Sequence, residues 1–468
     1  MDWHSSLHIA ASSGEYLPFW ARTGYDGIMP VSSSATALVG GDVRTDISSG
    51  IFMGAGANAA FSIIPQNHFG ENNAAFILDR LYFTAGWRML KCEVGIKSRE
   101  KELGDLSLTG GNIIYSGNAR NLPGINCYSD WIYFGKSHKF GIRGNIAHYE
   151  MRDLRYVTGT MVHNKSFAFR LAISKDADFI MGLDHWAQWG GTSPTKGTQP
   201  ATFDDYMRIF LARGGGSGAT ESDQINVLGN HLGREFLRVN WRADSFAMTF
   251  QYDKPFEDGS STRFQNYPDG VWSLRFRFND KDAWVNEVLY ELVTTAWQSG
   301  PIHDRPATED EMDNQADYLP GRVVIGGKDG YFNNSCYMSG WTHYGRSLGL
   351  PLMIVHAPGE DGVTPGFASN RVNGHHIGLR GKLSHKYPYT FKATYSSHRG
   401  CYDQAPDAFF ASEQEPWQVS LAFELTLPKS ALRAPLYYSV GLYADYGKIF
   451  PDSVGVTLRM FYKDSRKF

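Results

Sequence analysis

The chain has 468 residues and a formal net charge of −3, from 45 basic and 48 acidic side chains. Its length allows two or three ordinary domains or one large all-β domain. A hydrophobic fraction of 42% with 20% charged residues excludes both a disordered chain and a bundle of transmembrane helices. The near-neutral charge argues against a nucleic-acid partner, which would require a clustered basic surface.

Glycine and aromatic residues are over-represented, with 50 glycines and 14% aromatic residues. Glycine costs about 1 kcal/mol in a helix interior, and aromatic residues are enriched in strands, so the composition favours strands and turns. The four cysteines lie far apart and form no Cys-x-x-Cys pair. We therefore expect no zinc site, and neither a disulfide framework nor a reducing compartment follows.

The first residues of the given sequence are not expected to form a secretory signal. Met1-Asp2-Trp3 lacks the basic and apolar regions of a secretory signal. Nowhere do 18 apolar residues run together, as a transmembrane helix would require. Two interpretations stay open at this point: a cytosolic protein, or a mature sequence to which a start codon was added.

A dense cluster of polar and aromatic side chains closes a predicted strand at 179–181. Such residues recognise sugars when rings stack on C–H faces and planar polar groups bind hydroxyls. In the alternative interpretation they have a structural role. If the strands form a barrel that is plugged by helices, these side chains face inward and hydrogen-bond neighbouring strands where the barrel meets the plug. The candidate residues of this cluster are Asp184, His185, Trp186, Gln188 and Trp189.

The segment 202–211 is predicted to be a helix, because Phe203, Met207, Phe210 and Leu211 share one face. Thr202 suits the N-cap, acidic residues follow it in the first turn, and three glycines at 214–216 end it. A second short helix is predicted over 221–228, and the acidic stretch 312–319 is predicted to be a loop.

Long segments with a period of two recur along the rest of the chain. In the segment 417–427, the odd-numbered residues are apolar and most even-numbered residues are polar or small. The same alternation covers 246–252, 271–278, 438–445 and 454–462. Such segments predict about eighteen strands over the whole chain.

A membrane barrel explains these strands better than a soluble sandwich or propeller. The segments often reach about 10–14 residues, whereas soluble strands have a mode of about 5–6 residues and membrane-spanning strands need about 9–11. One face is consistently apolar, while the other is mixed, small and charged, which is typical of a lipid-facing wall around a polar lumen. Aromatic residues at segment edges are typical of an interfacial girdle; they are Trp131 to Phe134, Tyr387, Tyr389, Trp417, Tyr437 and Tyr438. The final residue, Phe468, is a common ending for such barrels.

Catalytic and metal motifs are weak in this sequence. Asp184 and His185 suggest a catalytic pair, but no nucleophile with a defined spacing and no Gly-x-Ser-x-Gly motif accompanies them. His375 and His376 are adjacent, and adjacent side chains on a strand point to opposite faces, so they would not chelate one ion together. We expect no catalytic residues, no metal site and no cofactor.

Several motifs resemble the Wzi-type family of capsule assembly proteins in its Bacteroidetes-like form. The central one is Leu-Asp-His-Trp-Ala-Gln-Trp-Gly-Gly at 183–191, which resembles the family's His-x-Ala-Gln-Trp-Gly-Gly signature. A second stretch, 339–352, contains Trp341, Tyr344 and Arg346 and resembles the family's long loop. Further matching stretches are 12–20, 202–206, 221–224, 229–233 and 370–379.

The resemblance implies an all-β fold: an outer-membrane β-barrel of about eighteen antiparallel strands, with short helices plugging the periplasmic side. We expect one barrel domain over 1–468, with 202–228 as the helical plug segment. The resemblance also implies a Gram-negative outer membrane and an export signal, so that Met1 stands where that signal was removed.

The implied function is lectin-like retention or assembly of capsular or other surface polysaccharide, without catalysis. Long outward loops are expected to bind the glycan, with avidity along a repeating polymer; they are 98–130, 263–269, 298–336 and 398–415. Expected partners are this polysaccharide, outer-membrane lipid and the capsule export machinery, with no nucleic acid, and the protein is expected to be a monomer. The alternatives are a porin or channel and, third, an outer-membrane enzyme acting on glycan or lipid.

Overall fold

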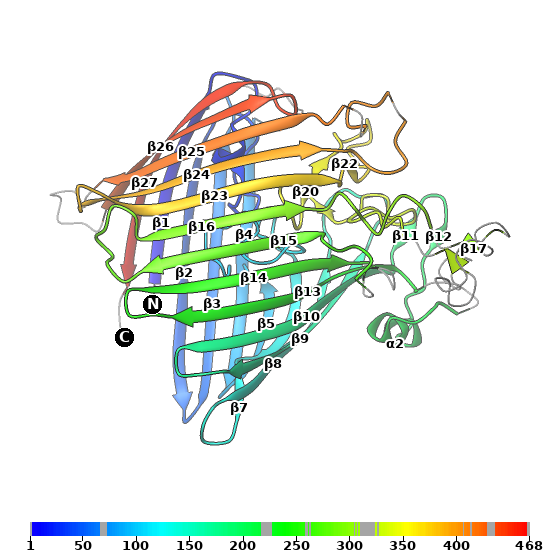
Figure 1. Ribbon diagram of the computed structural model, residues 1–468, viewed down its shortest axis with the longest axis horizontal. Helices are drawn as coiled ribbons and strands as arrows, with labels where there is room; N and C mark the ends of the chain where they lie inside the picture. The colour runs from blue at the N-terminus through cyan, green and yellow to red at the C-terminus, as the bar shows by residue number, and fades with distance from the viewer. Residues whose placement is uncertain are drawn as a thin grey trace.

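Long antiparallel strands follow one another around a closed wall (Figure 1). The computed structural model describes residues 2–65, 73–216, 227–257, 261, 264–303, 305–306, 308, 323–324, 327–405, 407–411, 414–427 and 436–465. The wall closes because β1 pairs with both β2 and β27, with Asp2 opposite Ser465. The first and last strands therefore meet, and the two ends of the chain lie at the same end of the barrel.

Nineteen strands of the described chain occupy eighteen positions in the wall, because β6 and β7 both pair with β8. The prediction of about eighteen strands is confirmed. The wall strands of the first half are β1 (Asp2–Ser12), β2 (Ser34–Ser48), β3 (Ile51–Ile63), β4 (Ala74–Trp87), β5 (Leu90–Ile96), β6 (Pro123–Ser129), β7 (Ile132–Phe134), β8 (Phe140–Glu150), β9 (Met161–Ala172) and β10 (Ala177–Trp189). Those of the second half are β13 (Asn230–Arg242), β14 (Phe246–Phe256), β15 (Gly270–Phe278), β16 (Glu287–Thr294), β23 (Val372–Leu383), β24 (Tyr387–His398), β25 (Trp417–Leu427), β26 (Leu436–Gly447) and β27 (Ser453–Ser465).

The alternating residues divide as a membrane barrel requires. In β25, Gln418, Ser420 and Ala422 are buried toward the lumen, whereas Leu421 is exposed on the outer face. Other strands also expose apolar side chains on the outside, among them Phe76, Phe83, Ile125, Phe167, Met181, Ile377, Leu442 and Val456. An apolar outer belt around a polar inner face is the inverse of a soluble sandwich. In the described part of the chain, no helix is long and apolar enough to cross a membrane.

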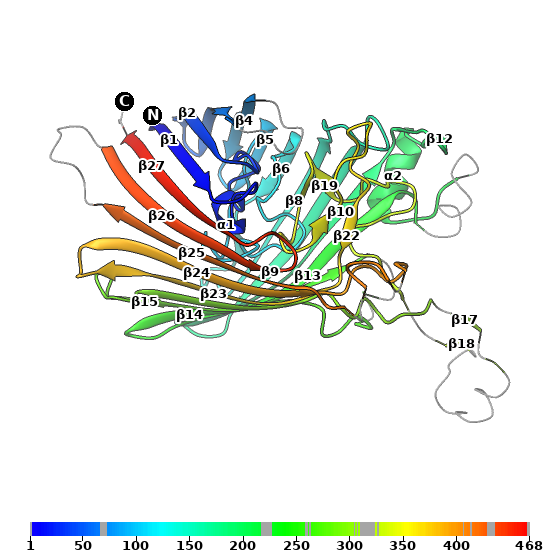
Figure 2. The same cartoon turned by 90° about the horizontal axis from the view of Figure 1, so that it is seen from above.

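The connections differ sharply between the two ends of the barrel. At the end that carries the termini they are short, such as 49–50, 88–89 and 243–245. At the opposite end they are long, and several contain small elements (Figure 2). These elements are α1 (Phe19–Arg22), β11 (Thr192–Ser193), β12 (Gly197–Thr198), α2 (Phe203–Leu211), β17 (Arg305–Pro306), β18 (Val323–Val324), β19 (Thr342–His343), β20 (Arg346–Ser347), β21 (Ile354–Val355) and β22 (Phe367–Ser369).

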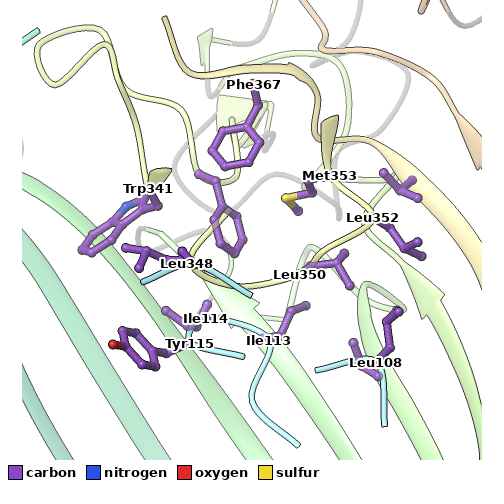
Figure 3. Close-up of a cluster of buried hydrophobic side chains, with 14 of the residues drawn as sticks. Leu108, Ile113, Ile114, Tyr115, Trp341, Leu348, Leu350, Leu352, Met353 and Phe367 are labelled. Carbon is purple, nitrogen blue, oxygen red and sulfur yellow. The ribbon is translucent and has the colours of Figure 1, made fainter. Parts of the chain in front are cut away.

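Three segments of the long connections, 13–33, 97–122 and 331–369, turn back into the lumen and build an apolar core there. Leu108, Ile113 and Ile114 of the second segment pack with Trp341, Leu348, Leu350, Leu352, Met353 and Phe367 of the third (Figure 3). Phe19 and Trp20 of α1 join the same cluster. Loops and one helical turn therefore occupy part of the lumen.

Polar side chains of the wall hold these segments in place. Glu291 accepts hydrogen bonds from the Ser107 hydroxyl at 2.6 Å and the Leu108 N–H at 2.7 Å. Asp253 accepts one from the Ile113 N–H at 2.9 Å, and Asp445 accepts one from the Phe19 N–H at 2.8 Å. Each buried carboxylate thus pairs with backbone groups that would otherwise lack partners.

The segment 202–228, expected to plug the lumen, begins on the outer wall instead. Helix α2 packs Tyr206 and Ile209 against Ala187 and Trp189, which lie on the outward face of β10. Its N-cap is Thr202, as predicted. The helix covers the outer wall because this face of β10 becomes aromatic and apolar above the lipid belt. The second predicted helix lies mostly in 217–226, outside the described residues, as do 312–319 and Phe468.

Candidate functional site: the lumen cavity

A cavity with a volume of about 810 Å³ lies in the lumen beside β5 to β10. A smaller cavity of about 310 Å³ adjoins it and shares Lys97 and Tyr128. The half-exposed lining residues lie toward the terminus-bearing end, where β6 and β7 meet at Trp131. Those lining the deep end, such as Asp184 and Arg234, are buried. The cavity is thus a cup whose deep end is closed by the apolar core of the lumen. We call this apolar core the lumen core and the cavity the lumen cavity.

Aromatic rings line much of the lumen cavity. At its deep end, Trp186 is sandwiched between Tyr115 at 5.2 Å and Tyr149 at 5.9 Å, with nearly parallel planes. The guanidinium of Arg99 lies 4.4 Å from the centre of the Trp186 ring. Trp186 itself is almost fully buried, and Tyr115 and Tyr149 line the cavity in front of it.

The rim nearer the termini is built from Trp131, Tyr133 and Tyr128, all half-buried. The guanidinium of Arg143 lies 4.8 Å from the Trp131 ring centre. Trp131 and Tyr133 were expected in an interfacial girdle with Phe134. In the structure, only Phe134 of these three is exposed on the outside, because side chains alternate between the two faces of the strand.

Asp184 lies among the charged side chains that form the deep end of the lumen cavity. It accepts hydrogen bonds from the Asn164 amide at 2.7 Å and the Asn112 amide at 3.1 Å. The guanidinium groups of Arg234 and Arg99 lie 3.6 and 3.9 Å from it. All of its nearby partners donate hydrogen bonds or carry positive charge, so this carboxylate holds neighbouring strands and the loop 97–122 together.

Glu102 forms a second charged centre at the cavity wall. It binds the guanidinium groups of both Arg143 and Arg238. Although burial opposes ionisation, Arg238 and Arg143 hold the pKa of Glu102 well below its usual range. The site therefore offers fixed charges and planar amides, including Asn126 and Asn145, and these groups suit a hydroxylated ligand better than an apolar one.

The predicted site residues divide between the two faces of the wall. Asp184, Trp186 and Gln188 point inward, whereas His185 and Trp189 point outward. His185 contacts His231 at 2.8 Å and stacks against Phe256 outside the lumen. Asp184 and His185 therefore lie on opposite sides of the wall, and the catalytic pair suggested by their adjacency does not form.

The remaining candidates belong to the lumen core or its surface. Gln188 donates a hydrogen bond to the Gly340 carbonyl at 2.8 Å, and Trp341 is completely buried. Arg346 donates to the carbonyls of Arg22 at 3.0 Å and Met29 at 2.6 Å, which joins two lumen segments. Tyr344 is partly exposed, with the Arg120 guanidinium 4.1 Å from its ring centre.

Sequence reasoning missed most of the cavity-lining residues. The stretch 98–130 was expected to be an outward glycan-binding loop, but 97–122 folds into the lumen and supplies the cavity floor. Arg143 and Asn145 lie in the alternating strand β8, and the sequence marked them only as polar residues on one face of that strand.

His375 and His376 do face opposite sides: the His375 ring contacts the Tyr290 hydroxyl, and His376 is buried beside Leu106. In the described chain, no group of three or more His, Cys, Asp or Glu residues is placed to hold a metal ion.

Comparison with known proteins shows similarity at the level of the fold. No family model matches the chain, and no curated protein matches its sequence. Among solved structures, Wzi of Escherichia coli has a TM-score of 0.55 at 10% identity, covering 99% of this chain and 85% of its own. It is described as an outer-membrane protein involved in group 1 capsule assembly and as a carbohydrate-binding β-barrel.

Further solved structures are also similar, at lower scores. OccAB4 of Acinetobacter baumannii has a TM-score of 0.46 at 11% identity, covering 99% of this chain and 97% of its own. OprD of Pseudomonas aeruginosa has 0.47 at 8% identity, covering 100% and 95%. The chain has the fold of an outer-membrane β-barrel. Its membership of the Wzi-type family is not established at these identities.

Proposed function

We propose that this barrel is a polysaccharide-binding protein of the Gram-negative outer membrane that helps assemble or retain capsular or other surface glycan. The observation that carries the proposal is the lumen cavity, where aromatic rings, planar amides and charged groups converge in one cup of about 810 Å³. Rings stack on sugar C–H faces, and paired amides and carboxylates bind hydroxyls. The carbohydrate-binding description of the structurally similar Wzi agrees with this proposal.

The position of the cavity suggests the side from which a glycan enters. In outer-membrane barrels, the short turns face the periplasm and the long loops face the exterior. The half-exposed rim at Trp131 and Tyr133 lies toward the short-turn end. A glycan held there would be one in transit to the surface, which fits an interaction with the export machinery. We further propose that the protein is a monomer in outer-membrane lipid and that it performs no catalysis.

Binding to the host's own surface polysaccharide tests the proposal. We expect detergent-purified protein to be retained on the immobilised polysaccharide and Trp131→Ala and Tyr133→Ala to weaken binding roughly tenfold, equivalent to about 1.4 kcal/mol. The matched control is Phe134→Ala, which removes an aromatic ring from the outer face of the same strand and should leave binding unchanged. No retention of the wild-type protein, or equal losses in all three variants, would refute the proposal.

A channel is the second candidate function, favoured by the adjoining cavities of about 810 and 310 Å³ at one end of the lumen. The apolar core formed by 13–33, 97–122 and 331–369 argues against an open path. Planar-bilayer recordings discriminate between the two: steady conductance of the wild-type protein would favour the channel, and silence would favour the plugged, glycan-binding barrel.

A further inference from the structure

A third cavity, of about 560 Å³, lies outside the lumen at the long-loop end of β16, β23 and β24. Thr294 and Asn373 line it, and strand alternation places both on the outward face, beyond the exposed Tyr290 and Ile377 of the lipid belt. We call this cavity the outer-wall pocket. Among its other lining residues are Trp297, Arg371, Arg399 and Tyr402.

The outer-wall pocket lies just above an aromatic girdle. Tyr290 and His375 are joined by a hydrogen bond of 2.8 Å on neighbouring strands, and Tyr395 and Trp417 stack with ring centres 6.5 Å apart. Aromatic girdles mark the level at which a barrel passes from acyl chains to headgroups. Arg371, the residue before β23, and the other pocket residues beyond the strand ends therefore lie at headgroup height.

Two guanidinium groups line the pocket. Arg371 donates from Nε to the Ala296 carbonyl at 3.0 Å, and its guanidinium lies 3.8 Å from the ring centre of Tyr402. These contacts orient the guanidinium at the wall of the pocket. Arg399 pairs with the carboxylate of Glu415 at 2.9 Å, and both are partly exposed. Among the described residues, Lys328 and Asp403 also carry charge near the site and pair with each other, and the carboxylates of Asp269 and Asp329 lie close enough to interact with Tyr402.

We propose that the outer-wall pocket binds a phosphate group in the headgroup of an outer-leaflet lipid. Arginine is suited to this ligand because its planar fork binds two phosphate oxygens at once and stacks on aromatic rings. Trp297, whose side chain is 48% exposed, offers an apolar surface to the sugar or acyl portion of the same lipid. The headgroup height of the pocket, its two arginines and its aromatic lining together suit one class of ligand, a phosphorylated glycolipid.

Native mass spectrometry of the full-length protein tests this site with two lipids, a bisphosphorylated acyl-disaccharide and its dephosphorylated form. We expect retention of the phosphorylated lipid at least tenfold stronger. Arg371→Gln combined with Arg399→Gln should abolish this difference. Glu415→Gln, which removes the carboxylate that competes for Arg399, should strengthen binding a few-fold. Binding should weaken as salt is raised, because exposed charges are screened.

The matched control is Arg88→Gln. Arg88 also lies beside an exposed tryptophan, with its guanidinium 5.2 Å from the Trp87 ring centre, but at the opposite end of the barrel. This variant should retain the lipid as the wild type does. Equal retention of both lipids, or no effect of the double arginine variant, would overturn the proposal. Displacement of the lipid by millimolar inorganic phosphate would also overturn it, because the site would then recognise a free ion.

Discussion

Gly349 shows how closely two lumen segments approach each other. A Cβ atom at this position would lie 2.0 Å from the Ile113 carbonyl oxygen and 2.7 Å from the Phe332 ring. Because the first contact is with backbone, the neighbour cannot rotate away. The tight packing in the lumen therefore depends on the absence of a side chain at one residue of the loop 331–353.

Gly349→Ala should accordingly loosen the lumen core. We expect a cost of about 1–3 kcal/mol, as is typical of overpacking, seen as faster hydrogen exchange in 110–115 and 346–352. Gly330→Ala is the control, because no atom lies within 4 Å of a Cβ at that position. Unchanged protection in Gly349→Ala would mean that the two segments separate without cost.

Asp269 makes the long loop after β16 sensitive to pH. It accepts hydrogen bonds from the Gln298 N–H at 2.7 Å and the Trp297 N–H at 3.2 Å. Burial nevertheless raises the pKa of Asp269 from 3.8 to about 6. The folded loop thus favours the protonated carboxyl, so its stabilising contribution is present at low pH and is lost as pH rises from about 4 to about 6.

We expect the free energy of local opening around 295–300 to fall by up to about 3 kcal/mol over this range, since one pKa unit corresponds to about 1.4 kcal/mol. Hydrogen exchange at several pH values, corrected for intrinsic exchange rates, measures it. Asp269→Asn should remove the dependence. A wild-type opening energy that is constant from pH 4 to 7 would contradict the assignment.

At the scale of elements, the strands and the one longer helix follow from local pattern. The predicted segment 417–427 coincides with β25, and the predicted strands at 246–252, 271–278, 438–445 and 454–462 lie within β14, β15, β26 and β27. Because the outer face contacts lipid, every second residue of a strand is apolar. The strands can therefore be recognised from the sequence without tertiary information. The predicted helix at 202–211 matches α2 for a similarly local reason, a capping box.

The capping box yields a test at this scale. The Thr202 hydroxyl accepts from the Asp205 N–H at 3.3 Å, and the Asp205 carboxylate accepts from the Thr202 N–H at 2.9 Å. Thr202→Ala should destabilise α2 by about 1 kcal/mol, measured by hydrogen exchange in 203–211. The barrel should melt as before, because α2 packs on its outer wall. Asp204→Asn, which changes only the interaction with the helix dipole, should have a smaller effect.

At the scale of the whole molecule, the described connections pack an apolar core inside the barrel. The apolar core draws residues from three segments, 13–33, 97–122 and 331–369, which are distant in sequence. A barrel of eighteen strands is wide enough to enclose a lumen, so its permeability depends on how these segments fill it.

Removing two of the segments should therefore open the lumen. We expect a variant in which 99–119 and 333–366 are replaced by short Gly-Ser linkers to conduct in planar bilayers, while the wild type stays silent. Heat-dependent electrophoretic mobility checks that the variant still forms a barrel. A silent variant with an intact barrel would show that other parts of the chain close the lumen.

The sequence by itself determined the class of fold, the approximate number of strands and the positions of several elements, because contact with lipid and local capping leave periodic signals. For the cluster at 184–189 it left a sugar-binding and an inward structural interpretation open, and it did not distinguish the inward side chains from the outward ones. Only the tertiary structure decided where the long connections go. The stretch 97–122 carries no periodic signal, and it enters the lumen because carboxylates on distant strands, Asp253 and Glu291, bind its backbone. The site is assembled by these long-range contacts, and no local pattern encodes them.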